Sequence, residues 1–170
     1  MSFQGRSLQQ PDFPDDDGAA APAVSAALAA YDAHPEAGHH GALAALQDSR
    51  LLVPVLAVLT EVEHDERGLA RDKSSEMAAV LITGRDGRKA LLAFTSADSL
   101  QAWNPDARPV PVHARDAARS ALHDGADALV IDVAGPALFP VEGQELRDLA
   151  DGLVLRRVED GWGWTRPLGG

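Results

Sequence analysis

Residues 78–95 constrain the fold most strongly, because two apolar runs flank a short polar turn. The runs are AAVLIT (78–83) and KALLAFT (89–95), and GRDGR (84–88) separates them. Two glycines and an aspartate in so short a connection predict a tight turn, so the runs should form an antiparallel β-hairpin. Neither run alternates between apolar and polar residues, which predicts strands that are covered on both faces.

The register of this hairpin predicts which polar residues meet at its open end. If the chain turns on residues 84–87 and Thr83 pairs with Arg88, then Ser75 lies opposite Ser96. The same register sets Glu76 opposite Thr95. The segment TSADSLQAW, which follows the second run, predicts a helix that is capped by Thr95 or Ser96.

A helix N-terminus carries unpaired N–H groups and a partial positive charge, so it favours a small carboxylate or phosphate. We therefore expect a candidate ligand-binding site at this edge of the sheet, made of Lys73, Ser74, Ser75, Glu76, Thr95 and Ser96. The alternative interpretation is a solvated rim, in which the hydroxyls only cap the helix and Glu76 pairs with Lys73.

The remaining segments predict an α+β fold with helices packed on a mixed β-sheet of about five strands, in which the hairpin is central. Helical patterns cover residues 23–34, 41–49, 114–124 and 143–151, and extended patterns cover 51–60, 110–112, 128–134 and 153–158. The prolines and the run Asp15–Asp17 predict a disordered acidic leader over residues 1–22. A single domain over 23–160 and a tail over 161–170 complete the expected organisation.

Charge and cysteine content exclude several classes of function. The chain carries 26 acidic and 15 basic residues, a net charge of −11, so nucleic acid and anionic membranes are unsuitable partners. It has no cysteine, which excludes disulfides, thiolate catalysis and cysteine-ligated metals. The first residues lack a signal-peptide core, and the apolar run 51–59 is too short to span a bilayer. We therefore expect a cytoplasmic protein.

Familiar catalytic motifs are absent from the sequence. It contains no G-x-S-x-G elbow and no phosphate-binding glycine loop, so we expect no catalytic residue, no cofactor and no metal. A loop between the first two helices holds His34, Glu36, His39 and His40, but their spacing matches no established metal motif and an exposed loop is favoured.

Two further positions have a functional and a structural interpretation. Asp132 interrupts the buried run ALVIDV, and it is either a functional acid at a strand end or a carboxylate that accepts backbone hydrogen bonds at the sheet rim. The segment GWGWT places Trp162 and Trp164 on one side of an extended strand. These indoles are a candidate interface, although packing at the edge of the core is the favoured role.

The ordered motifs resemble the SseB-like family, which is named for an enhanced-serine-sensitivity protein, and the sequence looks like its actinobacterial branch. The resemblance covers about residues 41–150 and is carried by RLLVPVLAV, KSSEMAAVLITGRDGRKALLAFTSADSLQAWNPDARPVPV and GADALVIDVAGP. It implies no reaction, cofactor or catalytic residue, because none is established for such domains.

The favoured hypothesis is a non-catalytic interaction or ligand-sensing module that self-associates through a sheet edge or the tryptophan-bearing tail. The alternative is a small enzyme or binding protein that acts on an anionic metabolite at the candidate site above.

Overall fold

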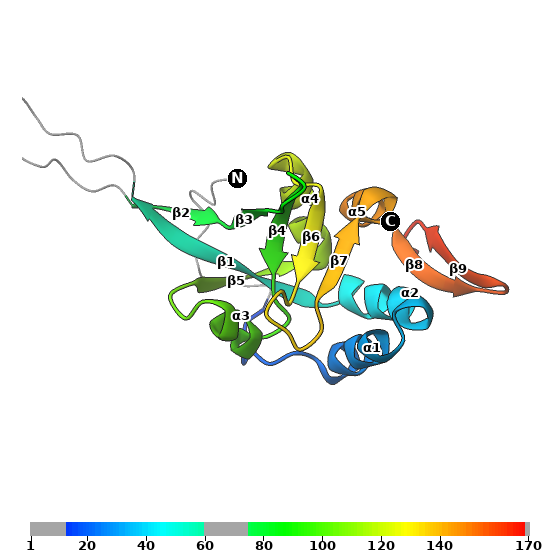
Figure 1. Ribbon diagram of the computed structural model, residues 1–170. Helices are drawn as coiled ribbons and strands as arrows, with labels where there is room; N and C mark the ends of the chain where they lie inside the picture. The colour runs from blue at the N-terminus through cyan, green and yellow to red at the C-terminus, as the bar shows by residue number, and fades with distance from the viewer. Residues whose placement is uncertain (1–12, 60–74, 169–170) are drawn as a thin grey trace, which may run out of the picture.

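The computed structural model describes residues 13–59 and 75–168, which hold five helices and nine strands (Figure 1). The helices are α1 (Pro22–Ala33), α2 (Pro35–Gln47), α3 (Ala97–Trp103), α4 (Ala114–His123) and α5 (Gly143–Ala150). The strands are β1 (Arg50–Leu59), β2 (Ser75–Ala79), β3 (Leu81–Thr83), β4 (Lys89–Ala93), β5 (Arg108–His113), β6 (Ala128–Ile131), β7 (Phe139–Glu142), β8 (Val154–Val158) and β9 (Gly161–Thr165).

The strands form three sheets, two of which are joined. One sheet has the order β2-β1-β5 and is antiparallel, and a second has the order β3-β4-β6-β7 with β4 and β6 parallel. A pair of backbone hydrogen bonds between Leu52 and Phe94, at 2.7 and 2.8 Å, links β1 to the end of β4. The third sheet is the β8–β9 hairpin. The predicted α+β class and mixed sheet are confirmed, with more strands than expected.

The predicted hairpin exists, but its register differs by one residue from the expected one. Thr83 pairs with Lys89 and not with Arg88. The reason is a three-residue loop, in which Gly87 N–H donates to the Gly84 carbonyl and Gly87 has a φ of 84°. A type I turn followed by a glycine bulge adds one residue to the connection that a two-residue turn would need.

The hairpin is also shorter than expected at its open end, because the residues before Val80 pair with a different strand. β2 pairs with β1, so Ser75 lies opposite Leu59 and Glu76 lies opposite Val58. The expected pairs Ser75–Ser96 and Glu76–Thr95 are therefore wrong. β1 is twice as long as β4 and offers an edge where β4 has already ended, which explains why the apolar run divides between two sheets.

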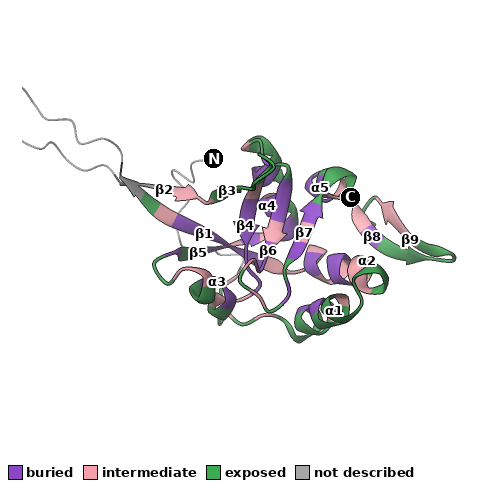
Figure 2. Ribbon diagram, viewed as in Figure 1, coloured by how far each residue is buried: buried purple, intermediate pink, exposed green. Residues whose placement is uncertain are grey.

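The core lies on both sides of β1 and β4. Leu91 and Ala93 of β4 face a large core under α1, α2, α4 and α5, whereas Leu92 and Phe94 face a smaller cluster that includes Leu100 of α3. All four of these consecutive residues, 91–94, are fully buried, which confirms the two-sided covering expected for this run (Figure 2). The same expectation is wrong for β3, which is exposed along its length at the edge of its sheet.

The loop expected between the first two helices is largely helical. α2 begins at Pro35, so Glu36, His39 and His40 lie on its first turns and only His34 separates the two helices. Proline fits the first position of a helix because its missing N–H is not needed there. The proline that ends α1 therefore also begins α2.

The chain segments on either side of the expected domain are also folded against it. Residues 13–21 make defined contacts with β1, β5 and α3, so the described part of the expected disordered leader is ordered. Residues 161–165, expected in the tail, form β9, and Trp162 and Trp164 pack against the large core. Figure 1 shows the β8–β9 hairpin at the right-hand end of the molecule, beyond α2 and α5.

Candidate functional site

A cluster of buried polar side chains lies where β4 and β6 end side by side. Asp132 directly follows β6 and is fully buried. Its Oδ1 accepts hydrogen bonds from Thr95 N–H at 2.9 Å and Ser99 Oγ at 3.0 Å, and its Oδ2 accepts one from Thr95 Oγ1 at 2.7 Å. Three donors offset the cost of removing this carboxylate from water.

The backbone at Asp132 turns the carboxylate toward β4. Asp132 N–H still donates to the Ala93 carbonyl at 3.0 Å, which extends the parallel pairing by one residue. Its φ of 54° then bends the chain, and its carbonyl accepts from Gly135 N–H at 2.9 Å. Aspartate tolerates this left-handed conformation better than most residues. Asp132 therefore accepts one backbone and two hydroxyl hydrogen bonds inside the core, not at an exposed rim.

Ser96, one of the two caps expected from the sequence, is the N-cap of α3. Its Oγ accepts from Ser99 N–H at 3.0 Å, and Ser99 Oγ accepts from Ser96 N–H at 3.3 Å, so the two serines form a reciprocal capping box. A residue outside the helix also accepts a hydrogen bond from the first turn, because Ala97 N–H donates to the Gly18 carbonyl at 2.7 Å. The anion-binding N–H groups expected at this helix start are thus partly used by the protein itself.

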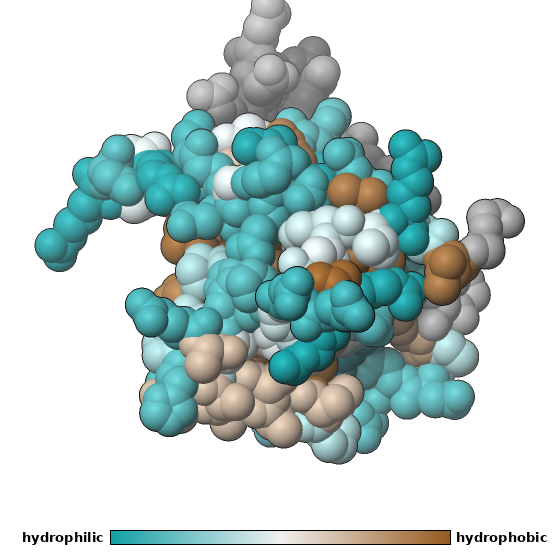
Figure 3. All heavy atoms as spheres, turned by 90° about the vertical axis from the view of Figure 1, so that its right-hand side faces the viewer, coloured by the Kyte–Doolittle hydropathy of each residue, from teal (hydrophilic) through white to brown (hydrophobic). Residues whose placement is uncertain are grey.

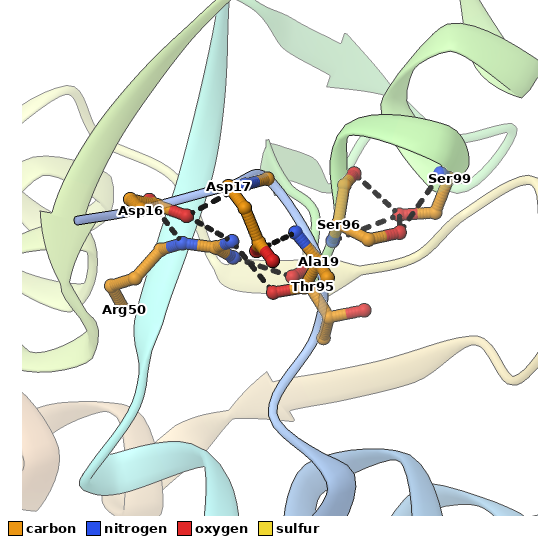
Figure 4. Close-up of polar contacts among 8 residues, drawn as sticks. Asp16, Asp17, Ala19, Arg50, Thr95, Ser96 and Ser99 are labelled. Atoms are coloured by element: carbon orange, nitrogen blue, oxygen red, sulfur yellow. Dashed lines mark hydrogen bonds and ion pairs between the residues drawn. The ribbon is translucent and has the colours of Figure 1, made fainter.

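Arg50 is the cation of the site, and the sequence did not identify it. Its Nε and Nη2 donate to the two oxygens of Asp16 at 2.6 and 2.8 Å, and its Nη1 donates to the Thr95 carbonyl (Figure 4). A further bond joins Nη2 to the Ala19 carbonyl at 2.9 Å. Arg50 is the first residue of β1, and the Leu52–Phe94 bridge brings that end of β1 beside Thr95.

The segment 13–19, which we call the strap, is held by this arginine. Within it, Asp16 Oδ1 also accepts from Gly18 N–H and Asp17 Oδ1 accepts from Ala19 N–H, both at 2.9 Å. The side-chain hydrogen bonds from Arg50 lower the pKa of Asp16 from its ordinary value, with a smaller effect from Gly18 N–H, while partial burial opposes the shift. The strap therefore closes over the start of α3 through an ionised carboxylate.

Two of the hollows beside the site differ in size and in lining. One has a volume of about 190 Å³ and is lined by Ser25, Leu28, Ala29, Asp32, Thr95, Asp132, Pro136 and Ala137. The other, of about 630 Å³, opens between the strap and the start of β1 and reaches Arg50. The second is large enough to accept several side chains of a ligand beside the guanidinium.

The structure brings only part of the expected ligand site together. Thr95 and Ser96 lie here, and Lys73 and Ser74 lie outside the described residues. Ser75 pairs with Leu59, at the opposite end of β1 from Arg50. At ~3.3 Å per residue those two ends of β1 are about 30 Å apart. Ser75 and Glu76 therefore do not join Thr95 and Ser96.

The histidines of α2 have structural partners. His39 Nε2 lies 2.6 Å from Glu145 Oε1, and its ring stacks on Phe139. The ring of His40 stacks on Trp162 at 6.1 Å between centroids. Within residues 13–59 and 75–168, no group of three or more acidic or histidine side chains is placed to hold a metal ion. In the same ranges, no helix is long and apolar enough to cross a membrane.

The fold and site define an α+β domain that gathers serine, threonine and aspartate at the start of a short helix beside an arginine. A family model described as the SseB protein N-terminal domain matches residues 24–148, and the chain belongs to this family. The resemblance drawn from the sequence motifs is thus confirmed at the level of the family, and its actinobacterial branch stays a prediction. No curated protein and no solved structure matches the chain. The match contains Arg50, Thr95 and Asp132, whereas the strap precedes it and β8–β9 follow it.

Proposed function

We propose that this SseB-family chain is a non-catalytic interaction module that recognises an acidic peptide segment at Arg50, beside the start of α3. The observation that carries the proposal is the two-point contact between the Arg50 guanidinium and the Asp16 carboxylate. Arginine recognises carboxylates by such a parallel pair of hydrogen bonds, and its planar fork makes the recognition geometrically specific. In this proposal Asp16 is the internal occupant of a carboxylate site.

The surroundings of Arg50 support a site that persists when Asp16 leaves. The bond from Nη1 to the Thr95 carbonyl orients the guanidinium from the side opposite the strap. The hollow of about 630 Å³ adjoins the same side chain, and residues 13–17 and 19 of the strap form one of its walls, so an incoming segment would take the place of that wall. Of the residues expected from the sequence, Thr95 contributes the carbonyl that bonds to Arg50, and Arg50 is the cation of the proposed site.

The test adds the strap to the protein as a separate peptide. Asp16→Ala in the full chain leaves Arg50 without its carboxylate, and an acetylated peptide of residues 13–20 provides one. We expect calorimetry to show that Asp16→Ala binds this peptide about tenfold or more tightly than the unaltered chain. The reason is that the tethered Asp16 competes in the unaltered chain at an effective concentration of about millimolar. A second substitution, Arg50→Ala, should abolish the binding.

The matched control is Asp15→Ala, since Asp15 is exposed and lies next to Asp16 in the sequence. This variant should bind the peptide as weakly as the unaltered chain does. Peptide binding that survives Arg50→Ala would contradict the proposal. Binding of a small dicarboxylate such as succinate by Asp16→Ala, without peptide binding, would instead favour the alternative of an anionic metabolite.

A further inference from the structure

The described sheet edges differ in how they are protected from pairing with another chain. Proline interrupts two of them, at Pro109 and Pro111 in β5 and at Pro140 in β7, and the edge strand β3 is three residues long. Short strands and prolines are common devices that block edge-to-edge pairing. β9, with the sequence GWGWT, has five residues and contains neither a proline nor a charge.

The outer edge of β8 is closed by a side chain. Gln47 Nε2 donates to the Leu155 carbonyl and Gln47 Oε1 accepts from Leu155 N–H, both at 2.8 Å. The amide of Gln47 thus takes the position of a neighbouring strand. Because Leu155 directs both backbone groups away from β9, its pair with Trp164 is not hydrogen-bonded within the hairpin.

The same alternation fixes the groups on the free edge of β9. Trp164 and, two residues earlier, Trp162 direct their backbone N–H and C=O groups outward, whereas Gly163 bonds to β8. These outward groups have no hydrogen-bond partner among residues 13–59 and 75–168. Figure 1 shows β9 as the outermost strand of this end, with the body of the molecule on the β8 side, so the edge is accessible.

We propose that β9 pairs antiparallel with β9 of a second copy of the chain, about a two-fold axis at Gly163. Trp162 of each copy then faces Trp164 of the other, and these two pairs use all the outward backbone groups of both tryptophans. The two hairpins become one four-stranded sheet. The two Gly163 residues face each other in the close, non-hydrogen-bonded type of pair, where Cα atoms approach to about 4.5 Å.

Charge supports this register. When Gly163 lies on the axis, Arg166 of one copy lies opposite Asp160 of the other, so two oppositely charged pairs flank the tryptophans. The hairpin and its flanks carry Arg156, Arg157 and Arg166 against Glu159 and Asp160, although the chain as a whole has a net charge of −11. Two copies therefore meet through one of the few segments that is not acidic.

The apolar surface near the axis is small. Val158 is 47% exposed, and a Cβ added at Gly163 would lie 3.6 Å from its Cγ1. Figure 3, which faces this end of the molecule, shows a mostly hydrophilic surface with small, scattered brown apolar spots and a pale apolar area along its lower edge, where α1 lies in Figure 1. Backbone hydrogen bonds and the flanking charges therefore hold the two copies together, and the dimer should dissociate on dilution. The pairing uses none of the contacts of Arg50, so it stands apart from the proposed peptide site.

Charged residues at Gly163 test both the interface and its register. The built Cβ meets only an ordinary contact, so Gly163→Lys and Gly163→Glu fit the monomer. In the dimer each variant puts two like charges directly opposite each other, which should weaken association up to about fivefold. An equimolar mixture of the two variants should restore a dimer, because the Lys then faces the Glu. Gly163→Ala is the uncharged control and should dimerise like the unaltered chain.

Sedimentation of the full chain over a range of concentrations measures these outcomes. Hydrogen exchange gives a second, residue-level readout: protection of the Trp162 and Trp164 amides should rise with protein concentration, while Gly163 changes little. A chain that stays monomeric at every concentration overturns the proposal. So does a dimer that both charged variants leave intact, and a mixture that fails to reassociate overturns the register at Gly163.

Discussion

The start of α3 and the β8–β9 hairpin differ in whether their polar groups have hydrogen-bond partners within the protein. Around α3, hydroxyls, a carboxylate and an arginine face one another, and no buried side-chain nitrogen or oxygen of the described residues lacks a hydrogen-bond partner. In the hairpin, the charged side chains of residues 156, 157, 159 and 160 are exposed to solvent, and the backbone of Trp162 and Trp164 faces outward without a partner in the described structure.

This difference teaches that a high density of polar side chains does not by itself mark a binding surface. The side chains of Thr95, Ser96, Ser99 and Asp132 bond mainly within this group, so they stabilise the turn from strand to helix. The group at that end proposed to bind a partner is Arg50, whose carboxylate in the structure comes from Asp16 of the strap. At the other end the unpaired groups are backbone N–H and C=O groups, and residue type does not predict which of these lack a partner.

The largest expected effect comes from removing the carboxylate of the α3 cluster. Asp132→Asn keeps the side-chain shape but turns an NH₂ group toward N–H or O–H donors, so a buried donor is left without an acceptor. We expect the free energy of unfolding to fall by about 3 kcal/mol, measured by chemical denaturation with tryptophan fluorescence. The control is Asp127→Asn, because Asp127 is exposed and accepts one bond from Lys89 N–H; its loss should stay below about 1 kcal/mol.

Equal effects of the two substitutions would break the comparison, since Asp132 would then contribute no more than a surface residue. A functional role for its carboxylate would become the better explanation of its burial. A cluster that is mainly structural requires a large difference between the two variants.

Much of the fold followed from local patterns. The apolar run over 89–95 predicted a strand covered on both faces, and Ser96 predicted the helix start, because burial and capping depend on residues close together in the chain. The point where β2 leaves the hairpin was not predictable in this way. A run such as AAVLIT can pair with either neighbouring strand, β1 or β4. Which strand it pairs with depends on where β1 extends beyond β4.

The candidate site was predicted only in part for the same reason. Thr95 and Ser96 were found because they adjoin a helix start, whereas Arg50 and Asp16 lie 34 residues apart and meet only through the folded sheet. No short-range pattern links an arginine at the start of one strand to a carboxylate in a proline-rich leader. Gln47 and Leu155, 108 residues apart, escaped prediction likewise.

The next effect concerns the attachment of the hairpin. Gln47→Leu keeps a similar volume but leaves the N–H and C=O of Leu155 without partners, so the hairpin should be destabilised by about 2 kcal/mol. Amide exchange at Leu155 should accelerate, while exchange at Thr95 and Ser99 should not change. The control is Gln144→Leu, which removes only exposed bonds to Asp148 and Arg147. Faster exchange at both ends of the molecule would show that the two regions are coupled and not separate.

The smallest effect, below about 1 kcal/mol for one accessible ion pair, concerns the pH dependence of the strap. The pKa of Asp16 is lowered in the folded chain from an ordinary value of 3.8, because Arg50 bonds to the ionised carboxylate. The stabilisation is therefore complete above the ordinary pKa and is lost as the pH falls below it, through the lowered pKa of the folded state. The chain with Asp16→Asn should lack this part of the acid dependence.

The measurement is the free energy of unfolding as a function of pH, compared between the unaltered chain and Asp16→Asn. Asp15, Asp17 and Asp48 line the same hollow and are present in both chains, so the difference between the two curves isolates Asp16. The curves should converge at the acid end and separate above the ordinary pKa, with the unaltered chain more stable. Curves that stay parallel throughout would mean that Asp16 is held as firmly when protonated, and a strap that does not depend on its charge could not be displaced by a competing carboxylate.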